Sequence, residues 1–489
     1  MKVLLTHTYF LNDDPKEQQI NKPYPPLGLL YLSAWLEKSD YNNEVFDATF
    51  SSKKKQRDYI LKNQPNVIAI YANLITKLNV IELVRFIRSQ EKLKNCLIVL
   101  GGPDVTYNIE NYLSFGADVL VIGEGEQTLL EVVQAHEKGF APQFGHISGL
   151  AFKDESGSII KTVKRSHLRQ IDELPIPNRK KIDLSLYLDL WKKHHGRNSI
   201  SLSTQRGCPY TCRWCSTAVY GQSYRRRSPK LVVEEMQFLK KNYDFDQIWF
   251  VDDVFTVSHK WLNSFYEELQ KQNVQVPFEC ITRADRLTEE VLKILKDCGC
   301  FRVWIGAESG SQKIIDAMDR RVTTSQVQDM IIAARQNGME TGTFIMLGYP
   351  GETEKDIQLT LEHLCRAKPD HFTITVAYPI RGTSLYKDVE NLFLDQQDWY
   401  AGTDRDLDFL RTYPRQYYDF AVRWVVNGVY FYQQKSKGNL WNWTVLKFGI
   451  KKRIARLGMS WYRLFGVKKS INEVSSKISK TPKSILSDS

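Results

Sequence analysis

Short apolar segments alternate with helical patterns in two series along this chain, and this alternation constrains the fold more than any other feature. The first series contains five β-branched, nearly continuous apolar runs: Val3–Leu5, Val45–Asp47, Val67–Tyr71, Leu97–Leu100 and Val119–Ile122. Helical patterns such as Leu29–Lys38 and Val80–Ser89 lie between these runs. Strands that are apolar throughout and alternate with helices predict an α/β fold with a doubly wound parallel sheet.

The second series begins at Ser199 and has six strand candidates. They are Ile200–Thr204, Ile248–Val251, Phe278–Thr282, Arg302–Ile305, Thr343–Leu347 and Phe372–Val376. Six strand–helix units predict a partial (β/α)6 TIM-like barrel, whose active site would lie at the carboxyl ends of the strands.

A chain of 489 residues is too long for one core. We expect a first domain over residues 1–141, a connector over 142–198 with a hairpin around Ser156-Gly157, and the barrel over 199–390. A helical extension over 391–434 and a basic tail over 435–489 would follow.

Three cysteines follow the first strand of the second series, in the run Arg-Gly-Cys208-Pro-Tyr-Thr-Cys212-Arg-Trp-Cys215. Three thiolates suit an iron–sulfur cluster with one iron left free of protein ligands. The alternatives are a structural zinc site or buried free thiols. Structural zinc takes four protein ligands, and no fourth Cys or His lies in the local run.

This Cys-x-x-x-Cys-x-aromatic-Cys motif, with Trp214 in the aromatic position, resembles the signature of the radical S-adenosylmethionine (SAM) enzymes. The resemblance implies that a 4Fe–4S cluster on Cys208, Cys212 and Cys215 binds the methionine part of SAM. One electron from the cluster would then cleave SAM to a 5′-deoxyadenosyl radical.

The other five cysteines do not indicate a disulfide framework, and we expect a reducing cytoplasm. Cys298 and Cys300 flank Gly299 at a spacing that could bind metal. Because buried free cysteine is common, we interpret this pair as structural.

Polar residues follow the later barrel strands, and the resemblance implies that several contact SAM. Arg283 offers two donors to the methionine carboxylate, although it could instead form a local ion pair with Asp285. Gly348 would let the adenine lie against the backbone, although Gly348-Tyr-Pro-Gly could also be an ordinary turn. The predicted SAM contacts are Trp214, Asp252, Asp253, Arg283, Glu308 and Gly348.

The first domain resembles the cobalamin-binding domain that is fused to many radical SAM proteins. The match rests on Pro25-Pro26-Leu27-Gly28, on Gly101-Gly102-Pro103 and on the run from Gly116 to Glu126. The predicted cobalamin contacts are Gly101, Gly102, Pro103, Gly123 and Gly125. The Asp-x-His-x-x-Gly motif of methionine synthase-type domains is missing, since the first loop has only His7. The alternative is a cobalamin-type fold that has become structural or binds another ligand.

The net charge of +11 belongs to the tail, because the first 434 residues carry 54 basic and 54 acidic groups. Leu446, Ile450, Ile454, Leu457, Trp461 and Leu464 recur at a helical period, among Lys447, Lys451, Lys452, Arg453, Arg456 and Arg463. Such a helix can lie on a membrane surface, or its apolar side can dock on the barrel. We expect the chain from about Ser470 to be disordered. The neutral body argues against nucleic acid as a partner.

Over residues 1–430 the chain therefore resembles a cobalamin-dependent radical SAM protein. The resemblance implies methylation of an unactivated carbon, with an external electron donor such as flavodoxin or ferredoxin. The tail suggests a hydrophobic substrate such as an isoprenoid. Two alternatives remain: a methyl-free oxidative or ring-forming reaction, as in the anaerobic magnesium-protoporphyrin ester cyclases, and a cluster-bearing electron carrier.

Overall fold

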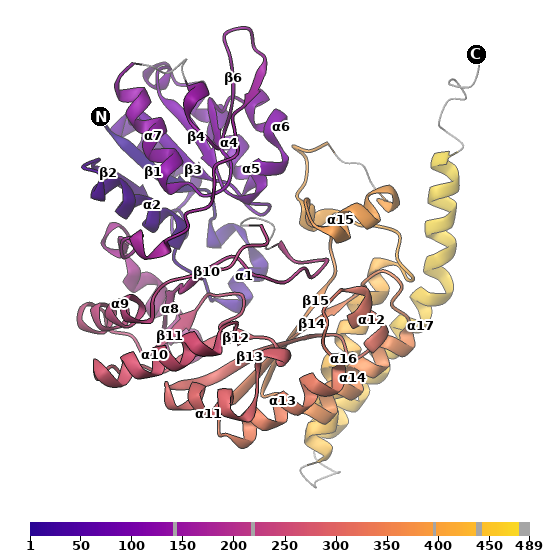
Figure 1. Ribbon diagram of the computed structural model, residues 1–489. Coiled ribbons are helices and arrows are strands. Elements are labelled where there is room, and N and C mark those ends of the chain that lie inside the picture. The colour runs from indigo at the N-terminus through magenta and orange to yellow at the C-terminus, as the bar shows by residue number, and fades with distance from the viewer. Residues whose placement is uncertain (140–143, 217–220, 395–397, 437–442, 479–489) are drawn as a thin grey trace.

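The computed structural model describes residues 1–139, 144–216, 221–394, 398–436 and 443–478, with side chains in the last segment as far as Leu464. Two sheets of mainly parallel strands lie one above the other, and a pair of long helices flanks the lower sheet (Figure 1).

The upper sheet has the order β2-β1-β3-β4-β5-β6-β7. Its strands are β1 (Val3–His7), β2 (Asn43–Phe46), β3 (Val67–Tyr71), β4 (Leu97–Gly101), β5 (Val119–Val121), β6 (Leu150–Lys153) and β7 (Ile159–Lys161). β1 to β5 pair in parallel, and separate apolar clusters cover the two faces. The predicted doubly wound sheet is confirmed. Its helices are α1 (Pro15–Ile20), α2 (Leu27–Lys38), α3 (Lys53–Asn63), α4 (Lys77–Arg88), α5 (Pro103–Tyr107), α6 (Ile109–Ser114) and α7 (Glu126–Glu137).

The predicted hairpin around Ser156-Gly157 is present as β6 and β7, but it does not act as a connector. β6 pairs antiparallel with β5, so the hairpin extends the sheet of the first domain. The proposed boundary at residue 141 therefore falls inside this sheet, and the linking segment is the chain from about residue 162 through α8 (Leu184–His195).

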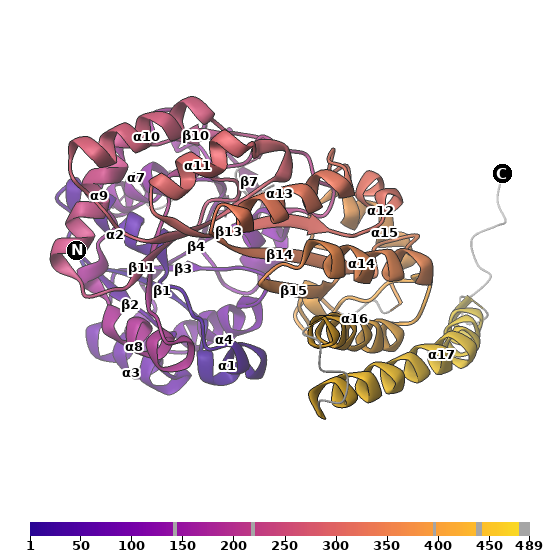
Figure 2. The same cartoon turned by 90° about the horizontal axis from the view of Figure 1, so that it is seen from below.

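The lower sheet contains the six predicted barrel strands in the order β15-β14-β13-β12-β11-β8, all parallel. They are β8 (Ser199–Leu202), β11 (Gln247–Phe250), β12 (Phe278–Thr282), β13 (Cys300–Glu308), β14 (Glu340–Leu347) and β15 (His371–Val376). The sheet curls into an open half-barrel (Figure 2). A two-stranded ribbon of β9 (Gln205–Arg206) and β10 (Arg225–Arg226) follows β8.

Helices cover the outside of the half-barrel and begin where the sequence supplies caps. The Ser258 hydroxyl caps one of them, and Thr353 forms a capping box with Asp356 at another. The helices are α9 (Pro229–Asn242), α10 (His259–Lys271), α11 (Glu289–Asp297), α12 (Gln312–Ala317), α13 (Thr324–Gln336), α14 (Glu354–Ala367) and α15 (Ser384–Val389).

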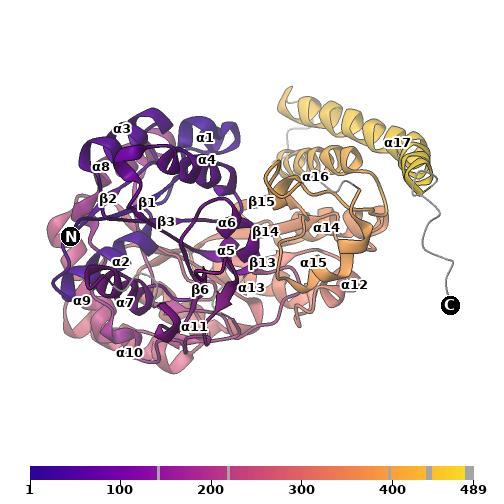
Figure 3. The same cartoon turned by 90° about the horizontal axis from the view of Figure 1, so that it is seen from above.

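Two long helices complete the chain: α16 (Arg415–Lys435) and α17 (Trp443–Ile478). They pack together beside β14 and β15, on the side away from the first domain (Figure 3). The backbone remains helical from Ser470 to Ile478, where the sequence predicts disorder, and residues 479–489 lie outside the described part. No helix in the described ranges is long and apolar enough to cross a membrane.

Candidate active site

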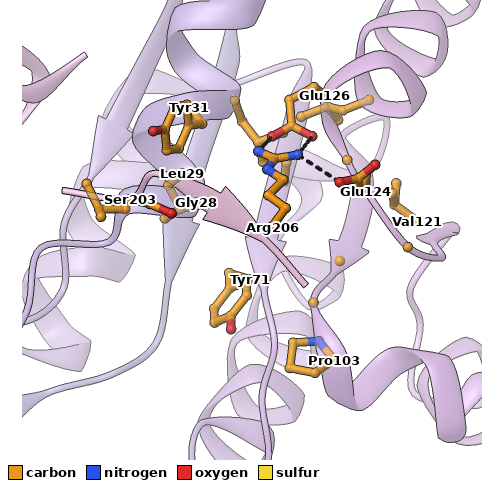
Figure 4. A pocket seen from close by; sticks show the side chains of 18 of the residues that line it. Gly28, Leu29, Tyr31, Tyr71, Pro103, Val121, Glu124, Glu126, Ser203 and Arg206 are labelled. Atoms are coloured by element: carbon orange, nitrogen blue, oxygen red, sulfur yellow. Dashed lines mark hydrogen bonds and ion pairs between the residues drawn. The ribbon is translucent and has the colours of Figure 1, made fainter. Parts of the chain in front are cut away.

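A cavity lies where the carboxyl edges of the two sheets face one another (Figure 4). Its empty volume is about 1440 Å³, including the part open to solvent. The first domain supplies the ends of β3, β4 and β5 and the starts of α2 and α7, and the barrel supplies the segments that follow β8 and β11. Both predicted ligand-binding edges therefore contribute to one space.

The five predicted cobalamin residues, Gly101, Gly102, Pro103, Gly123 and Gly125, all line this cavity. Gly102 has a φ of +111°, and a Cβ there would lie 2.4 Å from the carbonyl oxygen of Ala72. A side chain is therefore excluded from this position. Gly123 also has a positive φ, of +93°, but open space in front of it. A wall of bare backbone lets a large flat ligand approach closely.

His7 lies elsewhere. Its ring is buried, Nε2 lies 2.9 Å from the Asp47 carboxylate, and Nδ1 accepts from the Tyr9 amide. Burial raises the pKa of Asp47, but the hydrogen bonds and charge of His7 and its other neighbours lower it overall. Since His7 is held at the β1–β2 side of the sheet and is outside the cavity lining, it does not contribute to the space that would hold cobalamin.

Arg206 joins the two domains across the cavity. Its guanidinium pairs with Glu126 and, at 3.1 Å, with Glu124 (Figure 4). Arg225 adds a second ion pair to Glu124 at 2.8 Å. All four side chains are largely buried, so removing one partner would leave an uncompensated charge. These ion pairs fix the barrel rim against the glycine-lined wall.

The cysteine loop follows β9 beside the cavity. Cys208 is buried, whereas Cys212 and Cys215 are partly exposed. Burial raises the pKa of Cys208 to about 11, and the charges of Asp253, Cys215 and Cys212 act in the same direction. In the described part of the chain, no three His, Cys, Asp or Glu side chains converge on a point that could hold a single metal ion. Each thiolate of a four-iron cluster binds a different iron, so its sulfurs need not converge on one point.

Two buried guanidinium groups flank the Cys212 thiol. Nη1 of Arg283 lies 3.6 Å from Cys212 Sγ, and Nη1 of Arg320 lies 3.7 Å from it. Arg320 also approaches Glu308, with 3.8 Å between Nη2 and Oε1. Two cations beside this sulfur would offset the negative charge of a bound cluster.

The predicted pair of Arg283 with Asp285 exists, at 2.8 Å, together with the contact to Cys212. The remaining Nη2 donates to the Arg320 carbonyl at 2.6 Å, and the guanidinium lies over the Tyr210 ring. All the nitrogens of Arg283 are therefore engaged. A contact between Arg283 and a methionine carboxylate would have to displace one of these partners.

Glu308 has a φ of +63°, at the end of β13 where the pairing with β14 shifts register. A non-glycine residue in the left-handed region is unusual and is often found at functional sites. Burial raises the pKa of Glu308, while Arg320 and Arg283 oppose that rise. This carboxylate is thus connected, through Arg320, to the cysteine loop.

Asp252 and Asp253 follow β11 and differ in their surroundings. Asp252 is buried, and it accepts hydrogen bonds from the Thr204 amide at 2.8 Å and the Gln205 amide at 3.1 Å. This carboxylate holds the loop after β8 in place. Asp253 faces the cavity, and burial followed by the charge of Asp252 raises its pKa to about 6. Of the two, Asp253 is the one able to meet an ammonium group.

Gly348 and Trp214 lie on the other side of the cysteine loop. Gly348 has a φ of +77°, and its amide donates to the buried Glu352 at 2.6 Å. Its neighbour Tyr349 belongs to the apolar cluster on which Trp214 packs. The Arg320 guanidinium lies 5.9 Å from the centre of the Trp214 ring. The structure therefore brings Trp214, Arg283, Glu308 and the Gly348 turn around one loop.

Sequence reasoning missed three contributors. Arg320 lies in the charged run Asp319-Arg320-Arg321, a pattern that is typical of solvated surface. Gln205 lines the cavity, and neither atom of its buried side-chain amide has a hydrogen-bond partner among the described residues. Tyr71 lines the cavity at the end of β3. Tyr71 ends one predicted strand and Gln205 directly follows another, so strand position gave a usable signal for both but not for Arg320.

The remaining cysteines pack in the interior. Cys280, Cys298 and Cys300 are buried members of the barrel core. Burial, and then the neighbouring Cys300, raise the pKa of Cys280 well above its ordinary range. These buried positions agree with the structural interpretation.

Comparison with known proteins matches two stretches of the chain to known families. Residues 202–364 match the radical SAM superfamily, and residues 19–133 match the B12-binding domain. The chain is a radical SAM protein with a B12-binding domain.

Among its relatives is an uncharacterized methyltransferase of Pyrococcus horikoshii, which is 29% identical over 78% of this chain and 82% of the relative. The anaerobic magnesium-protoporphyrin IX monomethyl ester cyclase of Rubrivivax gelatinosus is 26% identical over 76% of this chain and 66% of the cyclase.

Among solved structures, the cobalamin-dependent radical enzyme OxsB with aqua-cobalamin bound aligns with a TM-score of 0.72. The alignment covers 98% of this chain and 75% of OxsB at 18% identity. At that identity the likeness concerns the fold, and it includes the arrangement of the two domains.

The residues of the site fit the cofactors that these families use. The bare backbone wall fits a corrin, and the separated thiols beside two guanidiniums fit a cluster whose fourth iron is free of protein ligands. Asp253 lines the same cavity, and Glu308 lies beside Arg320 at the cysteine loop. This radical SAM enzyme therefore uses a 4Fe–4S cluster, SAM and cobalamin.

Proposed function

We propose that this enzyme transfers a methyl group from SAM to an unactivated carbon of a hydrophobic substrate. One observation carries the proposal. A single cavity is lined by Gly207, by Asp253 and by the glycine wall of the first domain, which consists of Gly101, Gly102, Gly123 and Gly125. Gly207 directly precedes Cys208, and the charge of Asp253 acts on that cysteine. The groups that would hold cobalamin and the groups beside the cluster therefore face the same space.

When bound, the cluster supplies the electron that cleaves SAM, and cobalamin carries the methyl group. The protein positions these groups. Arg283 and Arg320 flank Cys212 and would offset the negative charge of the cluster. Asp253 orients the SAM ammonium, and the Arg206 ion pairs keep the two walls at a constant separation. Predicted contacts of Trp214, Glu308 and Gly348 with SAM are part of this proposal.

The proposed reaction uses two molecules of SAM for each methyl group transferred. One becomes S-adenosylhomocysteine, and the other becomes methionine and 5′-deoxyadenosine, which carries the hydrogen removed from the substrate. Two electrons are needed to restore the starting state, and we propose a one-electron donor protein such as flavodoxin or ferredoxin as their source.

A methyl-free oxidative or ring-forming reaction is the second candidate, since one relative is an ester cyclase. The products separate the two. Anaerobic enzyme with reductant and substrate should form both S-adenosylhomocysteine and 5′-deoxyadenosine if methylation occurs. 5′-Deoxyadenosine alone would assign the chain to the second reaction, and neither product would favour an electron carrier.

We further propose that the enzyme acts in the cytoplasm, at a membrane surface. Support comes from helix α17, where seven large apolar side chains between Trp443 and Leu464 are each 47–71% exposed. An enzyme that contacts the bilayer can take hydrophobic substrates from it.

A further inference from the structure

Helix α17 has two apolar faces, and among the described residues only one of them packs closely on the protein. Val445, Ala455 and Met459 are buried against α16. A Cβ at Gly458 would lie 2.3 Å from the Phe420 ring, so glycine permits this close crossing. The packed face is therefore satisfied by contacts within the chain.

The opposite face is open to solvent. We call it the apolar stripe: Trp443, Leu446, Ile450, Ile454, Leu457, Trp461 and Leu464. At about 100° per residue, the stripe is centred roughly 170° from the packed face. The alternative that this stripe docks on the barrel is therefore wrong. A continuous exposed apolar surface of this length marks an interaction site.

The charged residues at the edges of the stripe indicate which kind of surface it binds. Lys447 and Lys451 lie on one edge and Arg453 lies on the other, about 60° to 100° from its centre. All three are exposed, and the sequence from Trp443 to Leu464 contains no acidic residue. Basic edges beside an apolar face with tryptophans complement anionic lipid headgroups above acyl chains.

The remaining basic residues hold the helix in place. Arg456 pairs with Glu354, and Arg463 lies 3.1 Å from the same carboxylate. The Lys452 ammonium lies over the Trp424 ring. Because these contacts fix α17 on the first residue of α14, the stripe has a constant orientation relative to the half-barrel.

We propose that the apolar stripe, with Lys447, Lys451 and Arg453, is a docking surface for an anionic phospholipid bilayer. This inference rests on the proposed function for its purpose, but the surface itself can be tested without turnover. The helix would lie in the plane of the headgroups, with the packed face of α17 turned towards α16 and the half-barrel.

Flotation of the full-length protein with vesicles tests this surface. We expect binding to phosphatidylcholine vesicles that contain phosphatidylglycerol, and at least about tenfold weaker binding to phosphatidylcholine alone. The triple variant Lys447→Gln, Lys451→Gln, Arg453→Gln should lose about 100-fold in affinity. Ile450→Asp with Leu457→Asp should lose at least about tenfold.

Matched controls alter exposed residues on other helices. Lys54→Gln, Lys55→Gln, Lys62→Gln removes the same charge from α3, and Leu186→Asp with Ile332→Asp adds the same charge at exposed apolar positions. Both should bind as the wild type does. Equal loss in a control, or wild-type binding that does not depend on phosphatidylglycerol, would overturn the proposal.

Two further measurements distinguish failure of the docking proposal from failure of the proposed reaction. If light scattering finds a dimer that the stripe variant dissociates, and no vesicles bind, the stripe joins two copies and the lipid proposal fails. SAM cleavage with dithionite, measured without vesicles, tests the proposed function independently. Cleavage without vesicle binding contradicts only the docking proposal. Vesicle binding without cleavage contradicts only the proposed reaction.

Discussion

The two walls of the cavity are built by opposite means. The first domain presents bare backbone at Gly101, Gly102 and Gly123, so that wall contributes shape. The barrel rim presents charged groups: Arg206, Asp252 and Asp253 line the cavity, and Arg283 and Arg320 lie next to it at the cysteine loop. The difference teaches that a large rigid ligand is accommodated by removing side chains, whereas a cluster and SAM require groups of defined charge.

Loss of the cluster should have the largest effect. Replacing Cys208, Cys212 and Cys215 by Ala should remove nearly all of the about four irons per chain and abolish SAM cleavage. Cobalamin should remain bound, because its wall is elsewhere. Anaerobic metal analysis and visible spectroscopy measure both, and simultaneous loss of cobalt would show that the two walls are not independent.

A bulky side chain at the glycine wall should have the reverse effect, with cobalamin lost and the cluster retained. Gly28 lines the cavity, and a Cβ there meets nothing within 4 Å, so Gly28→Trp should fold and project into the space. We expect cobalamin affinity to fall at least about 100-fold with iron content unchanged. Gly145→Trp, at an equally open position outside the lining, is the control. Cobalamin loss in that control would contradict the assignment of the wall.

Arg320→Gln should have an intermediate effect. It removes a cation 3.7 Å from Cys212 Sγ and the partner of Glu308, so SAM cleavage should fall about 10- to 100-fold with iron retained. A changed reduction potential of the cluster would separate this positioning role from general instability. The adjacent Arg321→Gln, which alters an exposed pair with Asp319, should change neither quantity.

The smallest effect on turnover should come from the carboxyl beneath the Gly348 turn. Burial raises the pKa of Glu352 from 4.5 to about 8, against the lowering effect of the Gly348 amide. The folded protein therefore keeps a proton that the unfolded chain releases, and the free energy of unfolding falls as pH rises from about 4.5 to about 8.

Glu352→Gln should remove this slope and stabilise the protein at pH 8 by about 4 kcal/mol, with turnover nearly unchanged. Thermal unfolding across this pH range measures the effect. The exposed Glu390→Gln is the control, and an unchanged slope in Glu352→Gln would mean that Glu352 is ionised in the folded protein.

Much of this architecture could be predicted from local sequence. Both strand series, the cysteine motif and the glycines at strand ends follow from short-range patterns, because strand period, ligand spacing and positive φ are local properties. The hairpin of β6 and β7 shows the limit. Its turn was predictable, but its pairing with β5 depends on which sheet edge lies next to it.

Tertiary structure alone decided the rest. Arg320 becomes a neighbour of Cys212 only when the chain after β13 packs under the cysteine loop, across 108 residues of sequence. The period of the α17 stripe was visible in the sequence, but its direction was not. That direction depends on which apolar face of α17 packs more closely on α16. The glycines of α17 allow close contact with α16, so the larger side chains face solvent. The sequence determined which elements and ligand types exist, and packing between distant segments determined which of them share a site, because burial and charge pairing act through space.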